Sequence, residues 1–187
     1  MTATTPQRTT GERAELINAL DKHRGFLLQT AEGLTEDQAR TRSTVSALTI
    51  ASLLKHVADT EEQWFRFTVE GATAFDGGHG SDVDWNAIAA DDSWADVEWE
   101  DTRFVLSDHE TLEFLRARVE QVAARTAEIL RTADLDGAHP LPVAPWFEPG
   151  ASWSVRRVAI HVLAEISQHA GHADIIREAV DGQKTMG

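Results

Sequence analysis

Apolar residues recur every three or four positions in four segments of the chain, residues 11–32, 47–70, 107–133 and 153–182. This spacing matches the turn of an α-helix and places the apolar side chains of each segment on one face. The four stripes consist of Leu16, Ile17, Leu20, Leu27 and Leu28; Ile50, Leu53, Leu54, Val57, Trp64 and Phe65; Leu112, Leu115, Val119, Val122 and Ile129; and Val155, Val158, Val162, Ile166, Ala173, Ile176 and Val180. The pattern predicts four amphipathic helices.

Residues that commonly begin or end helices lie at the borders of these segments. Gly33, Gly71 and Gly182 follow the last apolar positions of the first, second and fourth segments, where glycine often ends a helix. Ser107 is followed three residues later by Glu110, which is the spacing of a capping box at a helix start. The third helix is therefore predicted to begin just after Ser107.

Four amphipathic helices in one chain of 187 residues predict an all-α fold, a four-helix bundle. Residues 71–106 separate the second helix from the third, which is far more than an ordinary loop, so we expect a long crossover connection there. Residues 1–10 are rich in threonine and are predicted to form a mobile tail. Residues 11–187 are expected to form a single domain.

The last segment carries His161, Glu165, His169 and His172 at spacings of four, four and three residues. On an α-helix these steps keep all four side chains on one face. His169 falls inside the apolar stripe, Glu165 lies at its margin, and His172 and His161 lie further toward the polar side. Because a carboxylate at the edge of a core is costly to bury unless it is paired or bound to a cation, the pattern indicates a metal site.

A third ligand for this site can come from the second segment. His56 is the histidine of that segment and lies at the margin of its apolar stripe. Opposite the last helix of a bundle, it would complete a set of two imidazoles and one carboxylate with Glu165 and His169, leaving coordination positions open for water or substrate. The competing interpretation is that a helix rich in His and Glu presents an ordinary solvated face.

Three further polar residues would lie near these ligands. His161 and His172 are candidates to support the ligands, to line a pocket or to carry protons. Glu61 projects toward the core side of the second segment and is a further candidate for a supporting role.

Charge and cysteine content narrow the classes of function. The 31 acidic and 17 basic residues give a formal net charge of −14, which opposes binding to nucleic acid or to an anionic membrane. The chain has no cysteine, so any metal must be held by His, Glu or Asp, and any reacting sulfur must come from another molecule. The first residues lack the apolar core of a secretory signal, which predicts a cytoplasmic location.

Two blocks of the sequence resemble the DinB-like superfamily of metal-dependent thiol transferases. They are RRVAIHVLAEISQHAGHADIIREAVDG at residues 156–182 and LTIASLLKHVADTEEQWF at residues 48–65. The blocks look most like the actinobacterial branch that includes a mycothiol S-transferase, and they are related to mycothiol-dependent maleylpyruvate isomerase and bacillithiol S-transferase. The resemblance covers the chain from about residue 10 to its end and implies a four-helix bundle with a long crossover between helices two and three.

The resemblance also implies a metal centre. Its ion is a divalent metal, zinc in the first place with nickel or iron(II) as alternatives, held by His56, Glu165 and His169. His161 is the alternative to Glu165, which we prefer as a ligand because it lies nearer the buried stripe.

The chemistry that the resemblance implies uses a low-molecular-weight thiol, mycothiol in this branch, which becomes a thiolate at the metal and attacks a small electrophile. His172 or His161 would move the proton. Two other functions stay open: a thiol-dependent isomerase or specialised biosynthetic enzyme on the same fold, and a non-catalytic stress protein that binds a metal or ligand. The exposed helix faces are compatible with a homodimer.

Overall fold

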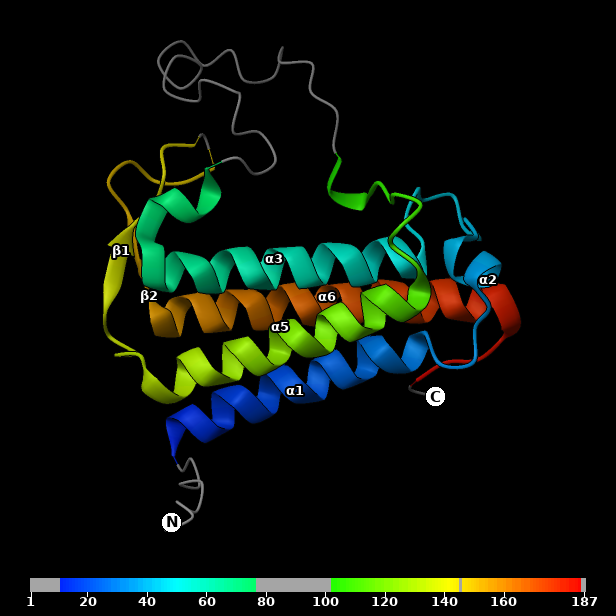
Figure 1. Ribbon diagram of the computed structural model, residues 1–187, viewed down its shortest axis with the longest axis horizontal. Coiled ribbons are helices and arrows are strands. Elements are labelled where there is room, and N and C mark those ends of the chain that lie inside the picture. The colour runs from blue at the N-terminus through cyan, green and yellow to red at the C-terminus, as the bar shows by residue number, and fades with distance from the viewer. Residues whose placement is uncertain (1–10, 77–101, 145, 186–187) are drawn as a thin grey trace.

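The computed structural model describes residues 11–76, 102–144 and 146–185 (Figure 1). The predicted tail, residues 1–10, lies outside the described residues. The elements are the helices α1 Glu12–Thr30, α2 Glu36–Arg40, α3 Ile50–Glu70, α5 Leu112–Thr132 and α6 Val155–Asp181, the 3₁₀ turns η1 Gly71–Phe75 and η3 Thr102–Phe104, and the strands β1 Ala138–Pro140 and β2 Ser152–Ser154.

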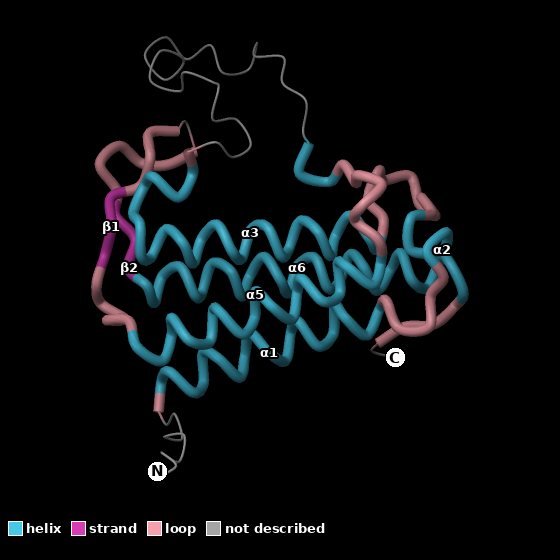
Figure 2. Tube along the Cα trace, in the orientation of Figure 1, coloured by secondary structure: helices cyan, strands magenta, loops and turns pink. Residues whose placement is uncertain are grey.

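Helices make up most of the described chain, and the short strands β1 and β2 form one small antiparallel hairpin (Figure 2). The all-α fold class is therefore confirmed. The helices α1, α3, α5 and α6 correspond to the four predicted segments, whereas α2 was not predicted. Among the described residues, no helix combines the length and the hydropathy needed to cross a bilayer.

The start of α5 differs from the prediction. Thr111 caps this helix by accepting a hydrogen bond from the backbone N–H of Phe114, so α5 begins at Leu112. Glu110 does accept a hydrogen bond of 2.7 Å from the backbone N–H of Ser107, but this pair closes a turn that precedes the helix. The hydrogen bond that the spacing of Ser107 and Glu110 predicts does form, but it stabilises the turn before α5 and not the first turn of the helix.

The four long helices form one bundle. α1 packs mainly against α6, and α3 packs against both α5 and α6. In Figure 1, α3 and α5 run in one direction while α1 and α6 run in the other. α3 therefore ends at the opposite end of the bundle from the start of α5, as the predicted crossover between them requires. Residues 77–101 of that crossover lie outside the described residues.

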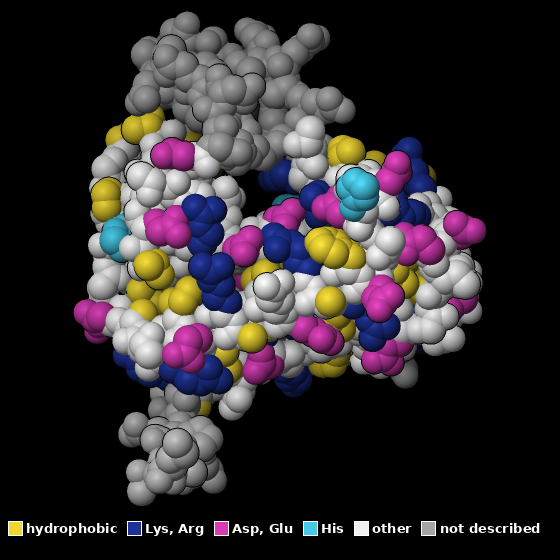
Figure 3. Space-filling model, viewed as in Figure 1, with side chains coloured by type: hydrophobic (Ala, Val, Ile, Leu, Met, Phe, Trp, Pro, Cys, Tyr) yellow, Lys and Arg dark blue, Asp and Glu magenta, His cyan; other side chains and the backbone are white. Residues whose placement is uncertain are grey.

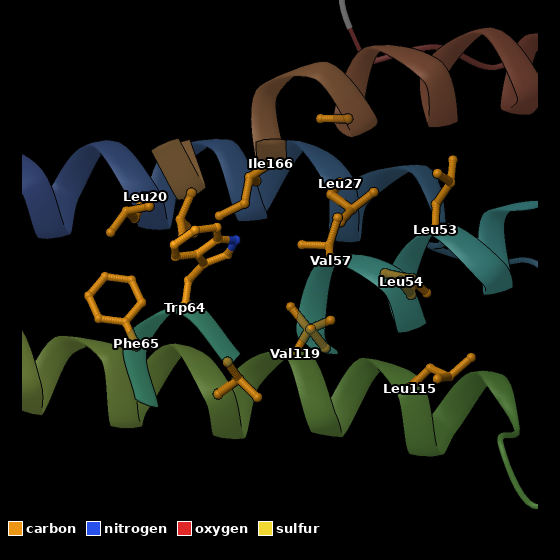
Figure 4. Close-up of a cluster of buried hydrophobic side chains, with 14 of the residues drawn as sticks. Leu20, Leu27, Leu53, Leu54, Val57, Trp64, Phe65, Leu115, Val119 and Ile166 are labelled. Carbon is orange, nitrogen blue, oxygen red and sulfur yellow. The ribbon is translucent and has the colours of Figure 1, made fainter. Parts of the chain in front are cut away.

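Side chains from all four long helices meet in the core (Figure 4). Leu20 and Leu27 of α1, Val57 of α3, Val119 of α5 and Ile166 of α6 are each no more than 1% exposed. Burying a side chain of this kind stabilises the fold by about 1.5–3 kcal/mol. The core therefore gives α3 and α6 a firm mutual position.

The β hairpin fixes the start of α6. Backbone hydrogen bonds of 3.0 Å run from Val155 N–H to the Gly137 carbonyl and from Arg156 N–H to the Leu135 carbonyl. Ser154 then caps the helix by accepting a hydrogen bond from the Arg157 N–H. The first turn of α6 is thus attached to the chain that directly follows α5.

Candidate metal centre

The helices α3 and α6 bring His56, Glu165 and His169 together inside the bundle. Glu165 Oε2 lies 3.6 Å from His169 Nε2 and 3.9 Å from His56 Nε2. The two imidazole rings meet edge to face, with centroids 4.7 Å apart. One possible ligand atom from each residue lies within 4.8 Å of the others, and among the described residues these three form the group that could hold a metal. We call them the metal group.

The apolar stripes explain why these residues meet. His56 lies on the buried side of α3 and is 6% exposed. His169 follows Ile166 by three residues and precedes Ala173 by four, so it shares their buried face of α6. Glu165 lies at the margin of that face, where its side chain is 30% exposed. The carboxylate therefore stands between two buried imidazoles and the solvent.

The charge state of Glu165 suits the metal group to binding a cation. The neighbouring imidazole of His169, and then that of His56, hold the pKa of Glu165 far below its ordinary value of 4.5, against the opposing effect of partial burial. Glu165 is therefore ionised at neutral pH. One carboxylate and two imidazoles are an ordinary donor set for zinc and similar ions.

The spacing of the donors also fits such an ion. Zinc bonds of about 2.0–2.1 Å in a tetrahedral site place neighbouring ligand atoms about 3.3 Å apart. The two separations from Glu165, 3.6 and 3.9 Å, are slightly larger, and the three donor atoms lie within 4.8 Å of one another, so small side-chain movements would bring them to that spacing. The residues present thus fit a divalent cation.

Two groups hold the imidazoles of the metal group in place. His172 Nδ1 lies 3.4 Å from His169 Nδ1, so a shared hydrogen there would leave His169 Nε2 facing Glu165. The ring of Phe104 stacks on the ring of His56 with centroids 4.3 Å apart. The structure therefore places His172 beside His169 of the metal group, where a supporting residue was expected. Phe104, from η3, was not predicted, because it lies outside the helical patterns.

His161 lies outside the metal group, one helical turn before Glu165. Its ring centroid is 4.8 Å from that of Trp64 and 5.0 Å from that of Trp153. Burial among these rings lowers the pKa of His161, although the negative charge of Glu165 opposes the effect. His161 is therefore a neutral imidazole at pH 7 that is still close enough to Glu165 to interact with it.

Glu61 was a candidate to support the metal group, but in the structure it pairs with Arg24 instead. Its two carboxylate oxygens accept hydrogen bonds of 2.9 and 3.0 Å from Arg24 of α1. Glu61 and Arg24 are only 1% and 3% exposed, so this is a buried ion pair that links α1 to α3. The apolar pattern placed Glu61 on the core side correctly, but the pattern carried no sign of its partner.

A pocket of about 370 Å³ borders the metal group. His56 and Thr60 belong to its wall, and Thr60 Oγ1 lies 3.5 Å from His56 Nε2. Figure 3 shows a hollow on this face, bordered by acidic and basic side chains. Apart from Ala74, the other residues of the wall have polar side chains: Lys55, Asp59, Glu62, Gln63, Arg66, Asp76, Thr102, Arg103 and Arg118. We call it the polar pocket.

The sequence model of one family, described as Mycothiol-S-transferase, matches residues 15–182. The chain belongs to the mycothiol-S-transferase family. This confirms the DinB-like resemblance, and it groups the chain with mycothiol-related S-transferases, which use a small-molecule thiol.

The fold of this mycothiol-S-transferase family member also occurs in a solved structure. The crystal structure of a conserved protein from Enterococcus faecalis matches with a TM-score of 0.58 and 16% sequence identity, covering 94% of this chain and 100% of that one. At this identity the likeness shows a shared fold. No curated protein matches the chain.

Proposed function

We propose that this mycothiol-S-transferase family member is a metal-dependent enzyme that joins the sulfur of mycothiol to a small electrophile. The ligands of the metal, for which zinc is the expected ion, are His56, Glu165 and His169. The observation that supports the proposal is the convergence of these three side chains, from α3 and α6, in a chain of this family. A bound divalent cation would supply the positive charge that keeps a neighbouring thiol deprotonated at neutral pH.

The chain itself has no sulfur nucleophile, because it contains no cysteine. The thiol must therefore enter as a co-substrate. In the transfer, the thiol loses its proton and its sulfur forms a bond to an electrophilic carbon. The displaced electron pair leaves with a leaving group or, in an addition, is neutralised by a proton.

Two histidines beside the metal group are suited to handle these protons. His161 is held neutral by burial among Trp64 and Trp153, so its imidazole can accept a proton from an incoming thiol. His172 contacts His169, and it can hold that ring in one orientation and pass a proton toward solvent. Phe104 covers one face of His56 and limits water there.

Metal analysis of the purified protein tests the first part of the proposal. We expect about one equivalent of a divalent metal in the wild type and a large loss in His169→Ala. His109→Ala is the matched control, since His109 is an exposed histidine outside the metal group. A wild type without stoichiometric metal after reconstitution, or a His169→Ala variant with undiminished metal, would refute the proposed centre.

A transfer assay tests the second part. Mycothiol and a generic electrophile such as a haloalkane or monochlorobimane are incubated with metal-loaded protein, metal-free protein and His169→Ala. We expect an S-conjugate only with metal-loaded protein that carries His169. A metal-loaded protein inert with every thiol and electrophile would refute the transferase and favour the binding protein, whereas an isomerised product with recovery of the thiol would indicate the isomerase.

A further inference from the structure

The polar pocket contains charged side chains that the proposed transfer does not use. Arg118 of α5 donates to Asp59 at 2.8 Å and to Glu62 at 2.9 Å, both on α3. The ammonium group of Lys55 lies 3.3 Å from the second carboxylate oxygen of Asp59. These cations and carboxylates are therefore already paired with one another inside the wall of the pocket.

This pairing decides which ligands the pocket suits. An anionic ligand would have to compete with Asp59 and Glu62 for Arg118 and with Glu70 for Arg66, which weakens the attraction of these two guanidinium groups for phosphate or carboxylate. The paired groups still keep unused hydrogen-bonding capacity, because a guanidinium has five N–H donors and each carboxylate has about four acceptor positions. Such a wall presents donors and acceptors side by side.

Gln63 adds a neutral group to the same wall. Within the part of the chain that the structure describes, its side-chain amide makes no hydrogen bond, so both its NH₂ and its oxygen are available to a ligand. A hydroxyl group both donates and accepts, and it can therefore satisfy an amide, a carboxylate and a guanidinium in turn. The chemistry of the wall matches a ligand with several hydroxyl groups and no charge.

The size and the position of the pocket match the thiol co-substrate. About 370 Å³ lies within the range of small-molecule sites. Since His56 belongs both to the wall and to the metal group, a molecule in the pocket borders that group.

We propose that the polar pocket binds the uncharged, polyhydroxylated sugar part of the thiol, with Arg118 and Gln63 as the residues that determine thiol specificity. The assignment of this ligand to a sulfur-transfer reaction rests on the proposed function. Recognition of the sugar by the pocket needs no metal, so the two can be tested separately.

Binding of a thiol-free fragment tests the pocket alone. The fragment N-acetylglucosaminyl-inositol, whose acylated nitrogen carries no charge, is titrated into metal-free, full-length protein in EDTA and followed by NMR, with glucose 6-phosphate as an anionic sugar for comparison. We expect the N-acetylglucosaminyl-inositol to bind at least fivefold more tightly than the glucose 6-phosphate. Gln63→Ala should weaken fragment binding about fivefold and Arg118→Gln about tenfold, as expected for the loss of neutral and charge-assisted hydrogen bonds.

The matched control is Arg125→Ala. Arg125 also lies on α5 and approaches Glu62, at 3.8 Å, but it does not line the polar pocket. Its loss should leave fragment binding within twofold of the wild type. Gln63→Ala breaks no ion pair, so it keeps the test decisive if thermal unfolding shows that Arg118→Gln is misfolded. Equal binding by wild type and Gln63→Ala, or preference for glucose 6-phosphate, would overturn the proposal.

Steady-state kinetics separate this proposal from the proposed function. The ratio of kcat/KM for mycothiol to kcat/KM for N-acetylcysteine, which lacks the sugar, should fall about fivefold in Gln63→Ala and about tenfold in Arg118→Gln. An active enzyme with an unchanged ratio would refute sugar binding by the polar pocket but would agree with the proposed transferase function. Fragment binding that depends on Gln63, in a protein without transfer activity, would support sugar binding by the polar pocket and refute the proposed transferase function.

Discussion

Replacing Glu165 by glutamine should weaken metal binding by an amount that thermal unfolding can measure. The glutamine keeps the shape of the side chain but removes its negative charge and replaces one carboxylate oxygen by NH₂, at a group whose Oε2 lies 3.6 and 3.9 Å from the two imidazole nitrogens. Loss of groups that merely support metal ligands costs 10- to 100-fold in affinity, so we expect a loss of about 100-fold for a ligand.

The loss of zinc affinity predicts a change in the free energy of unfolding and therefore in Tm. At a free zinc concentration about 1,000 times the wild-type Kd, binding stabilises the native state by about 4.1 kcal/mol. A 100-fold weaker site would retain only about 1.4 kcal/mol, a difference of about 2.7 kcal/mol. For a chain of 187 residues, 1 kcal/mol shifts Tm by about 2–4 °C. The zinc-induced rise in Tm should therefore be about 5–11 °C smaller in the variant.

The assay is thermal unfolding of each protein in zinc and in EDTA. Taking the difference for each protein removes any effect of the substitution on the metal-free fold. Glu178→Gln is the matched control, because Glu178 is an exposed carboxylate on the same helix. Its zinc-induced shift should equal that of the wild type. A full wild-type shift in Glu165→Gln would refute the assignment of Glu165 as a ligand.

Four further substitutions or conditions have defined outcomes. Glu61→Gln should lower the free energy of unfolding, measured in urea, by about 3 kcal/mol because it removes the buried charge partner of Arg24 and leaves only the exposed carboxylate of Asp21 beside it. Arg24→Met combined with Glu61→Leu should recover most of this loss. Thr126→Val should raise stability by about 1 kcal/mol in the same assay, because the Thr126 hydroxyl is buried without a partner among the described residues. His161→Phe should keep Tm within about 3 °C while kcat for S-conjugation falls about 100-fold, since the ring packing survives and the proton acceptor does not. The ionised form of Glu165, whose pKa is lowered from 4.5 by His169 and His56, stabilises the metal-free fold above about pH 4.5, and this contribution is lost as the pH falls toward the folded-state pKa. The stability difference between wild type and Glu165→Gln in EDTA should therefore shrink from about pH 6 to pH 3, and a constant difference would contradict the assigned shift.

The helices of the bundle were predictable because each buries a continuous apolar stripe. The same stripes explain why His56 and His169 face each other, since each lies on the buried side of its helix. The spacing of the residues in the sequence was therefore enough to predict that the three residues of the metal group lie close together. It could also place Glu165 at the margin of the core, where the structure finds it partly exposed.

Partners that lie far apart in sequence and on different helices were not predictable. Arg24 pairs with Glu61, but a charged residue in the stripe of α1 gives no sign of which carboxylate it will meet. Phe104 reaches His56 from a 3₁₀ turn in the long crossover, where no periodic pattern exists. The β hairpin was missed because strands of three residues are too short to show an alternating pattern.

That hairpin determines where the chain can change length without harm. Each residue inserted into a helix rotates everything beyond it by about 100°. An insertion between Val155 and Glu165 would therefore turn Glu165 and His169 away from His56. An insertion between β1 and β2 would leave the bonds from Val155 and Arg156 to the preceding chain in place, and with them the rotation of α6. We therefore expect natural length variation, and tolerated inserted tags or loops, to concentrate in the connection between the strands.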